Sequence, residues 1–588
     1  MSLSPFSPPS LAIALPAIAL AACAATERRF PLRTPLTQDT DLRPVNVACH
    51  TAATAKDPHH VSCAPEEYVS PLMWDGADQM VFRPLSEALA IDHHGEAVDV
   101  NSFDEVPDSA WFTNRLGVHP ITLEQLRLGA CSPSSLLHPE SAADGSWVID
   151  KGKSNGSSPG FRVNIGGKAK YMFKSDSGGQ PERPSAASII GAAAYHAVGF
   201  YSSCEQIVYF KPSLLKLLPG LRTQANFSPP KSFDQKALDD LLKDTPWRGE
   251  FVRFQASAWL PGSLIGPFQY TGTRSDDPND VIAHDDRREL RGGRLLAAWL
   301  DHFDAREQNT MDTWISDRKD EPDGSPGHVV HYYLDTSDCL GSEWAWDAIS
   351  RRLGHSYVID WGDTAADFVT LGIPTRPWDR VRRQPGREIF GYFNARDFVA
   401  DQWKNEYPNA AFSRMTERDG AWMARILARF TPEMVVTLAE MGQFTDSGHT
   451  SYLASVLEGR LQKILERYLT RLSPIGDVRV EGSDQVCGVD LAEARRVREP
   501  SAFAYVAYSG RSARGAPLAV SRREGGVVCV TVPHLASDGG APDDAPGRYV
   551  GVAIADGVAR GPLVVYLYDL GPNRGYRLAG LERPEQVP

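Results

Sequence analysis

HFDAREQN, residues 302–309, follows directly on a segment, residues 284–303, whose apolar side chains recur at the spacing of an amphipathic helix. The stretch places the carboxylate of Asp304 and the amide of Asn309 five residues apart, just beyond that helix. A carboxylate can accept or orient the proton of an incoming hydroxyl group, and an amide oxygen can bind Mg²⁺. These two residues are therefore the first candidates for a catalytic site.

A second acid, Asp335, follows the short apolar run Tyr332–Leu334, 26 residues beyond Asn309. The pattern predicts a strand that ends at this aspartate, and residues 316–328 look like the tip of a long hairpin that precedes it. A carboxylate at a strand end is well placed to bind a metal ion.

Upstream, the pattern is that of β-structure. Strands are predicted at residues 147–149, 161–165 and 170–174, with Gly166-Gly167 as the hairpin turn, and Lys174 ends the last of them. A mostly buried helix is predicted over residues 186–198, and further strands at 205–211 and 250–260.

The turn between the first two strands is rich in glycine. Gly152, Gly156 and Gly160 have no side chain, so backbone N–H groups could approach an anion closely there. The spacing is G-x-x-x-G-x-x-x-G.

The order of these features over roughly residues 145–470 resembles the protein-kinase-like superfamily, in its atypical branches that include HipA-type and Fam20-type kinases. The resemblance implies Lys174 on the phosphates of ATP or another nucleoside triphosphate, with Glu182 as its partner because residues 183–204 hold no acid. It implies Asp304 as base, and Asn309 and Asp335 on Mg²⁺. Four features depart from the family. Thr336-Ser337 replaces Phe-Gly after the metal-binding aspartate, and the gap before that aspartate is longer than in most kinases. The glycine spacing differs, and Glu182 lies at the mouth of the next helix instead of inside it.

The fold class expected is α+β, with a bilobal kinase-like domain and a small all-β, sandwich-like C-terminal domain. The predicted divisions follow the changes in pattern along the chain. They are 1–22 signal peptide, 23–100 tether and irregular extension, 101–262 N-lobe, 263–474 helical C-lobe and 475–588 β-domain.

The N-terminus predicts export. Residues 11–22 are an unbroken apolar run, too short to span a bilayer, and Leu20-Ala21-Ala22-Cys23 resembles the lipobox of bacterial lipoproteins. The resemblance implies a lipid on Cys23, an extracytoplasmic membrane-anchored protein and, because Ala24 is not Asp, the outer membrane in a Gram-negative cell. Outside the cytoplasm Cys49 and Cys63 could pair, whereas the other cysteines are expected to be small buried hydrophobes.

The net charge of the chain argues against one class of partner. The 588 residues carry a formal charge of −13, which argues against a nucleic-acid partner.

Local charge patterns predict ion pairs at the surface. Arg287, Arg288 and Arg291 are expected to pair there with neighbouring acids.

The expected function is Mg²⁺-dependent transfer of a phosphoryl or nucleotidyl group to an acceptor that the sequence does not identify. The alternatives are a catalytically inactive kinase-like scaffold and a serine hydrolase using Ser158 in Gly156-Ser157-Ser158-Pro159-Gly160. The hydrolase motif needs a helix after it, but a strand is predicted there.

Overall fold

The computed structural model describes most of residues 29–585, and no helix among them is both long enough and apolar enough to cross a membrane. Within that range the residues not described are 53–56, 90–94, 154–157, 177, 225–227, 345, 513 and 536–539. Cys23 and Gly156, both candidates from the sequence, lie outside the described residues.

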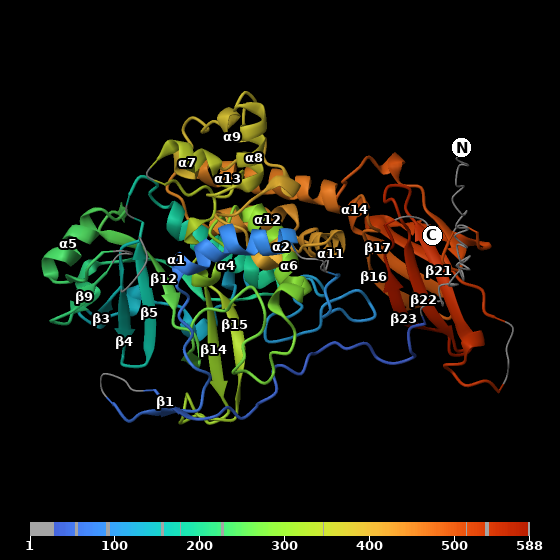
Figure 1. Cartoon of the computed structure of the whole chain (residues 1–588), viewed down its shortest axis with the longest axis horizontal. Helices are drawn as coiled ribbons and strands as arrows, with labels where there is room; N and C mark the ends of the chain where they lie inside the picture. The colour runs from blue at the N-terminus through green and yellow to red at the C-terminus, as the bar shows by residue number, and fades with distance from the viewer. Residues whose placement is uncertain are drawn as a thin grey trace, which may run out of the picture.

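A seven-stranded sheet gathers most of the strands between residues 147 and 258, on the left in Figure 1. Its order is β11-β12-β5-β4-β3-β8, with β7 also paired to β12. The bounds are β3 (Trp147–Gly152), β4 (Gly160–Ile165), β5 (Ala169–Ser175), β7 (Glu205–Phe210), β8 (Leu215–Leu217), β11 (Trp247–Arg248) and β12 (Phe251–Ala258). The predicted strands and the Gly166-Gly167 turn are confirmed, and alternate side chains such as Phe161 and Phe173 form one buried cluster.

Helix α4 (Arg183–Val198) lies at the centre of the molecule and is almost entirely buried, as the alanine-rich pattern predicts. Its small residues let the backbone of neighbouring segments approach the helix closely. A Cβ at Gly191 would lie 2.5 Å from Thr336 Oγ1, and Thr336 donates a hydrogen bond to the Ser188 carbonyl at 3.0 Å. The segment that follows β15 (Gly327–Tyr333) is therefore held against α4.

The helical half packs around one large core. Its main helices are α6 (Arg288–Leu300), α11 (Glu417–Leu427), α12 (Pro432–Met441) and α13 (Ser447–Tyr468). The predicted hairpin is confirmed as β14 (Thr310–Ser316) and β15, in a four-stranded sheet with β6 (Tyr201–Ser202) and β13 (Ser263–Leu264). Smaller helices are α3 (Leu123–Leu128), α5 (Gln235–Lys243), α7 (Asp347–Arg352), α8 (Trp361–Thr370), α9 (Pro377–Arg380) and α10 (Ala410–Ser413).

Two expectations are corrected here. The segment expected to be irregular contains α1 (Leu72–Ala77), the π-helical turn η1 (Asp78–Phe82) and α2 (Arg83–Leu89), whose exposed apolar residues give no core-facing periodicity.

The arginines expected at the surface, Arg287, Arg288 and Arg291, are buried. Arg288 pairs with Asp104 at 2.7 Å and Asp419 at 3.3 Å, acids that are distant in sequence. Because only the fold brings those partners together, the local sequence indicates surface pairs instead.

The C-terminal strands form one eight-stranded antiparallel sheet, at the right of Figure 1. Its order is β16-β17-β20-β19-β18-β21-β22-β23, and the edge strands β16 and β23 contact each other. The all-β prediction is confirmed, but the two stacked sheets of a sandwich are replaced by one nearly closed sheet, which covers its own edges. The bounds are β16 (Ile475–Glu481), β17 (Gln485–Asp490), β18 (Val506–Ser509), β19 (Pro517–Arg523), β20 (Val527–Thr531), β21 (Tyr549–Ala555), β22 (Leu563–Asp569) and β23 (Tyr576–Glu582).

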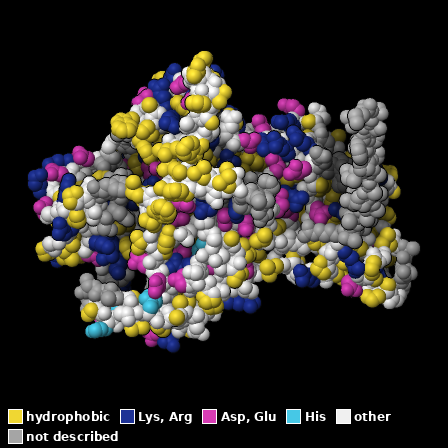
Figure 2. Space-filling model, in the orientation of Figure 1, with side chains coloured by type: hydrophobic (Ala, Val, Ile, Leu, Met, Phe, Trp, Pro, Cys, Tyr) yellow, Lys and Arg dark blue, Asp and Glu magenta, His cyan; other side chains and the backbone are white. Residues whose placement is uncertain are grey.

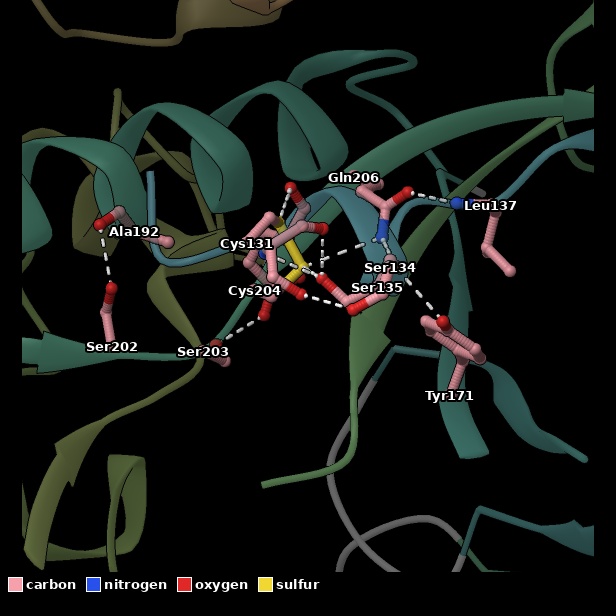
Figure 3. Close-up of a disulfide and its surroundings, with 12 residues drawn as sticks. Cys131, Ser134, Ser135, Leu137, Tyr171, Ala192, Ser202, Ser203, Cys204 and Gln206 are labelled. Carbon is pink, nitrogen blue, oxygen red and sulfur yellow. Dashed lines mark hydrogen bonds between the residues drawn. A yellow bond between two sulfur atoms is a disulfide. The ribbon is translucent and has the colours of Figure 1, made fainter. Parts of the chain in front are cut away.

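Three disulfides join Cys49 to Cys63, Cys131 to Cys204 and Cys487 to Cys529. The first confirms the predicted pairing, and the other two correct the expectation of unpaired buried cysteines. Figure 3 shows Cys131–Cys204 tying the loop at residues 131–137 to the start of β7. The same loop accepts a hydrogen bond from Tyr171 of β5 at the Ser135 carbonyl, 3.0 Å away.

Candidate functional site

Lys174 and Asp335 form the centre of the site, although 161 positions separate them in the chain. Lys174 Nζ lies 2.7 Å from Asp335 Oδ1, and Ser337 Oγ donates to the same oxygen at 2.7 Å. Burial alone would raise the pKa of Asp335, but Lys174 and then Lys153 outweigh it and hold that pKa well below its usual range. Burial would likewise lower the pKa of Lys174, which Asp335 instead raises. The pair is fully ionised.

Asp304 lies buried beside a second acid, Asp338, on the short turn η7 (Thr336–Asp338). Burial, followed by the neighbouring Asp338 carboxylate, raises the pKa of Asp304 well above its usual range. Asp304 Oδ1 is buried and has no hydrogen-bond donor among the described residues. The sequence analysis does not identify Asp338 as a site residue, although it follows Asp335 by only three positions.

Asn309 closes the loop that carries Asp304. It ends the turn η6 (Glu307–Asn309), and its Nδ2 donates to the Asp304 carbonyl at 2.7 Å. The amide nitrogen is thereby used in shaping the loop, so the oxygen is the atom of this side chain that could bind a cation. His302 braces the same loop, with Nδ1 2.9 Å from the Tyr195 hydroxyl.

The glycine-rich turn contributes Lys153, a residue to which the sequence pattern assigned no role. Lys153 is buried, and its Nζ donates to the Ser158 carbonyl at 2.8 Å. Burial, and then the charge of Lys174, lowers the pKa of Lys153 to about 8. Two lysines thus face Asp335 from the sheet.

Gly152 and Gly160 have a structural reason to lack side chains. A Cβ on Gly152 would lie 2.3 Å from the Arg222 carbonyl oxygen, and one on Gly160 would lie 2.3 Å from that of Phe173. Any larger residue would push neighbouring strands apart, so these glycines secure backbone packing at the turn.

Glu182 does not contact Lys174. It is the N-terminal cap of α4, with φ of 67°, and its carboxylate accepts hydrogen bonds from the backbone N–H of Thr445 at 2.9 Å and from the Thr445 hydroxyl. The acid whose charge acts on Lys174, after that of Asp335, is Glu205 at the start of β7. Glu205 comes one position after the acid-free interval 183–204, but only the strand order β5-β12-β7 places it near the lysine.

A cavity of about 810 Å³ lies between the sheet and the helical half, next to the Lys174–Asp335 pair, which is not itself part of its lining. Asp304 and Asp338 lie in its wall with two cations, Arg183 and Arg306. Arg183 also donates to the carbonyls of Ser337 and Cys339, at 2.8 and 2.7 Å, which fixes the turn that carries Asp338.

Ser158 lies in the same wall, but β4 follows its turn at Gly160, so the strand–turn–helix context of a nucleophile elbow is absent at this serine. The serine-hydrolase alternative therefore has no structural support at Ser158.

No family model matches the chain, and no curated protein matches it. Among solved structures, the Helicobacter pylori proinflammatory kinase CtkA shows a weak likeness, with 10% sequence identity and a TM-score of 0.28. That match covers 55% of this chain and 97% of the other. A likeness of this degree carries no argument about function, which must be inferred from the geometry of the site.

Proposed function

We propose that the protein binds a nucleoside triphosphate with Mg²⁺ in this cavity and transfers a phosphoryl or nucleotidyl group to an acceptor hydroxyl. The seven-stranded sheet and the helical half are the two lobes of this kinase-like arrangement. The observation that carries the proposal is the 2.7 Å contact between Lys174 and Asp335 beside the buried Asp304–Asn309 loop. Two lysines beside Asp335, together with Asp304 and Asp338 in the cavity wall, match the charges of a triphosphate and its cation.

Each side chain has a task in this proposal. Lys174 and Lys153 neutralise phosphate oxygens, and Asp304 accepts or orients the acceptor hydroxyl proton. Burial, followed by Asp338, raises the pKa of Asp304, which makes its carboxylate a stronger proton acceptor than that of an exposed aspartate. Asn309 keeps the Asp304 loop in place through its bond to the Asp304 carbonyl.

The site suits a divalent cation. Asp304 and Asp338 are two acids in mutual repulsion, and the buried Asp304 Oδ1 has no donor among the described residues. Asp335 and Asn309 would bind Mg²⁺ with one of these acids, since carboxylate and amide oxygens are its preferred protein ligands. Mg²⁺ bound there supplies positive charge to the phosphate oxygens.

The proposed location is the outside of a bacterial membrane, through a lipid on Cys23. Three disulfides support an oxidising compartment, because such bonds are rare in the cytoplasm. Mass spectrometry of the protein purified from membranes would detect the acyl chains, and an unmodified Cys23 would contradict the anchor.

Thermal unfolding with and without Mg-ATP tests the function. Ligand at 100 times its dissociation constant stabilises by about 2.7 kcal/mol, which is readily measured. Asp335→Asn should abolish the shift, whereas Asp320→Asn, in the exposed tip of the β14–β15 hairpin, should retain it. A full shift in Asp335→Asn would remove this residue from the site, and no response of the parent protein to any nucleotide would favour the scaffold.

A further inference from the structure

An exposed apolar surface runs over α1, α2 and α8. We call it the apolar band and define it by Trp74, Leu85, Trp361, Phe368, Leu371 and Ile373. Trp361 Nε1 donates to the Met80 carbonyl at 2.7 Å, which joins α8 to the α1–α2 segment. Figure 2 shows apolar side chains spreading from α1 and α2 towards α7 and α8.

The apolar band is most prominent at the C-terminal end of α8 and just beyond it. Phe368, Leu371 and Ile373 are 84, 86 and 82% exposed. Soluble monomers rarely expose many large apolar side chains together, so a band of this kind indicates an interaction site. The side chains protrude instead of lining a groove, and a lipid surface accepts protruding apolar groups without requiring a complementary shape.

Positive charge adjoins the same end of the apolar band. Residues 376–387 contain five arginines and one aspartate, in a chain whose formal charge is −13. Arg380 and Arg382 are exposed. They donate hydrogen bonds to the Thr375 hydroxyl and to backbone carbonyls, and neither has an acid partner among the described residues. Arginine beside tryptophan and aliphatic side chains suits an anionic bilayer interface.

The inner side of the α1 segment reaches the candidate site. The hydroxyls of Tyr68 and Ser70 donate to Glu307 at 3.3 and 3.0 Å, and Gln308 donates to Ser70 at 2.6 Å. Glu307 and Gln308 belong to the loop between Asp304 and Asn309. One short segment therefore carries part of the apolar band outside and supports the catalytic loop inside.

We propose that the apolar band, with Arg380 and Arg382, docks the protein on an anionic lipid surface. Docking would place the cavity close to acceptor groups at the lipid surface. This consequence rests on the proposed function. The docking itself requires no nucleotide.

Sedimentation with vesicles tests the proposal. The full chain carrying Cys23→Ser, which removes any lipid from that residue, is mixed with phosphatidylcholine vesicles that contain or lack phosphatidylglycerol. We expect binding to the anionic vesicles that weakens with salt. The change Phe368→Ser/Leu371→Ser/Ile373→Ser should lower binding by about tenfold or more, since each side chain loses its apolar contact with the bilayer.

Two further variants separate the contributions. Arg380→Gln/Arg382→Gln should weaken binding only to anionic vesicles, and Val281→Ser, at a 78% exposed position outside the apolar band, should leave it unchanged. Far-UV circular dichroism checks that each variant folds.

Equal binding by the triple serine variant, or no binding of the Cys23→Ser parent to anionic vesicles, would overturn the proposal. A dimer that the triple variant loses, without vesicle binding, would assign the apolar band to a second copy and overturn it too. Asp335→Asn should bind vesicles like the parent, so failure of the nucleotide assignment and failure of docking are distinguishable.

Discussion

Two groups of buried charges, one on the seven-stranded sheet and one beside the cavity, differ in how completely they are paired. Arg253, on β12, pairs with Asp176 at 3.0 Å, and its guanidinium also donates to Tyr209, Ser185 and the carbonyls of Gly442 and Gln443. In the cavity, by contrast, Asp304 faces another acid and keeps an oxygen without a donor among the described residues.

The difference separates structural charges from functional ones. A buried charge that is fully paired and hydrogen-bonded holds its surroundings in place, and here Arg253 joins the sheet to residues 442–443. A buried charge with incomplete pairing costs stability unless a ligand completes it. The Asp304 group therefore lies where we propose the binding site, and the Arg253 group holds the neighbouring elements together.

The largest effect is expected from Arg253→Met. The change leaves Asp176 buried without its cation, which should cost about 3–5 kcal/mol of unfolding free energy. Chemical denaturation measures the loss. Arg248→Met, on the neighbouring and exposed strand β11, is the matched control and should cost far less. An equal loss in both variants would contradict the structural assignment of Arg253.

Lys153 should make nucleotide binding depend on pH. Its pKa of about 8 means that the amine loses its charge as pH rises through 8, so affinity for Mg-ATP should fall on the order of tenfold between about pH 7 and pH 9. Lys153→Met should bind weakly with a flat profile, and Lys168→Met, in the exposed turn before β5, should behave like the parent. Calorimetric titration with Mg-ATP at several pH values measures the affinity. If the affinity of Lys153→Met fell with pH as steeply as that of the parent, Lys153 would not be the titrating group.

A smaller effect of opposite sign is expected from Asp304→Asn. The folded-state pKa of Asp304 lies above its unfolded value of 3.8, so ionisation disfavours the folded state as pH rises above about 4. The amide should therefore stabilise the ligand-free protein at pH 8 and leave its stability unchanged near pH 3, while abolishing transfer. Asp176→Asn should instead destabilise at pH 8. If Asp304→Asn and Asp176→Asn both lowered the unfolding free energy at pH 8, the Asp304 and Arg253 groups would not differ in the way described.

The smallest effect is expected from Glu182→Gln. Because the Glu182 carboxylate bonds to Thr445 and not to Lys174, nucleotide affinity should stay within about twofold of the parent. Glu205→Gln should lower it more, since Glu205 acts on the charge of Lys174. The reverse order in calorimetry would restore Glu182 as the partner of the lysine.

Local features of the fold were predictable. The Gly166-Gly167 turn, the buried alanine-rich helix α4 and the β14–β15 hairpin each follow from neighbouring residues, because strand and helix periodicity acts over a few positions. Within the site, the same local logic places Asn309 on the Asp304 carbonyl, five residues away.

Other features were not predictable, for one physical reason. Glu205 approaches Lys174 through an intervening strand, Asp104 reaches Arg288 from a distant segment, and Asp338 meets Asp304 only when α4 holds the turn after β15. The closing of the C-terminal sheet also depends on contact between its first and last strands. None of these contacts has a local signature.

The sequence by itself determined the residue types, the helix and hairpins that carry them, and the Asp304–Asn309 loop, because backbone geometry and side-chain periodicity act over short distances. Only the tertiary structure decided which charges meet: Lys174 with Asp335, Asp304 with Asp338, and Arg253 with Asp176. Electrostatic pairing depends on distance in space and on exclusion of water, and both arise when the chain packs.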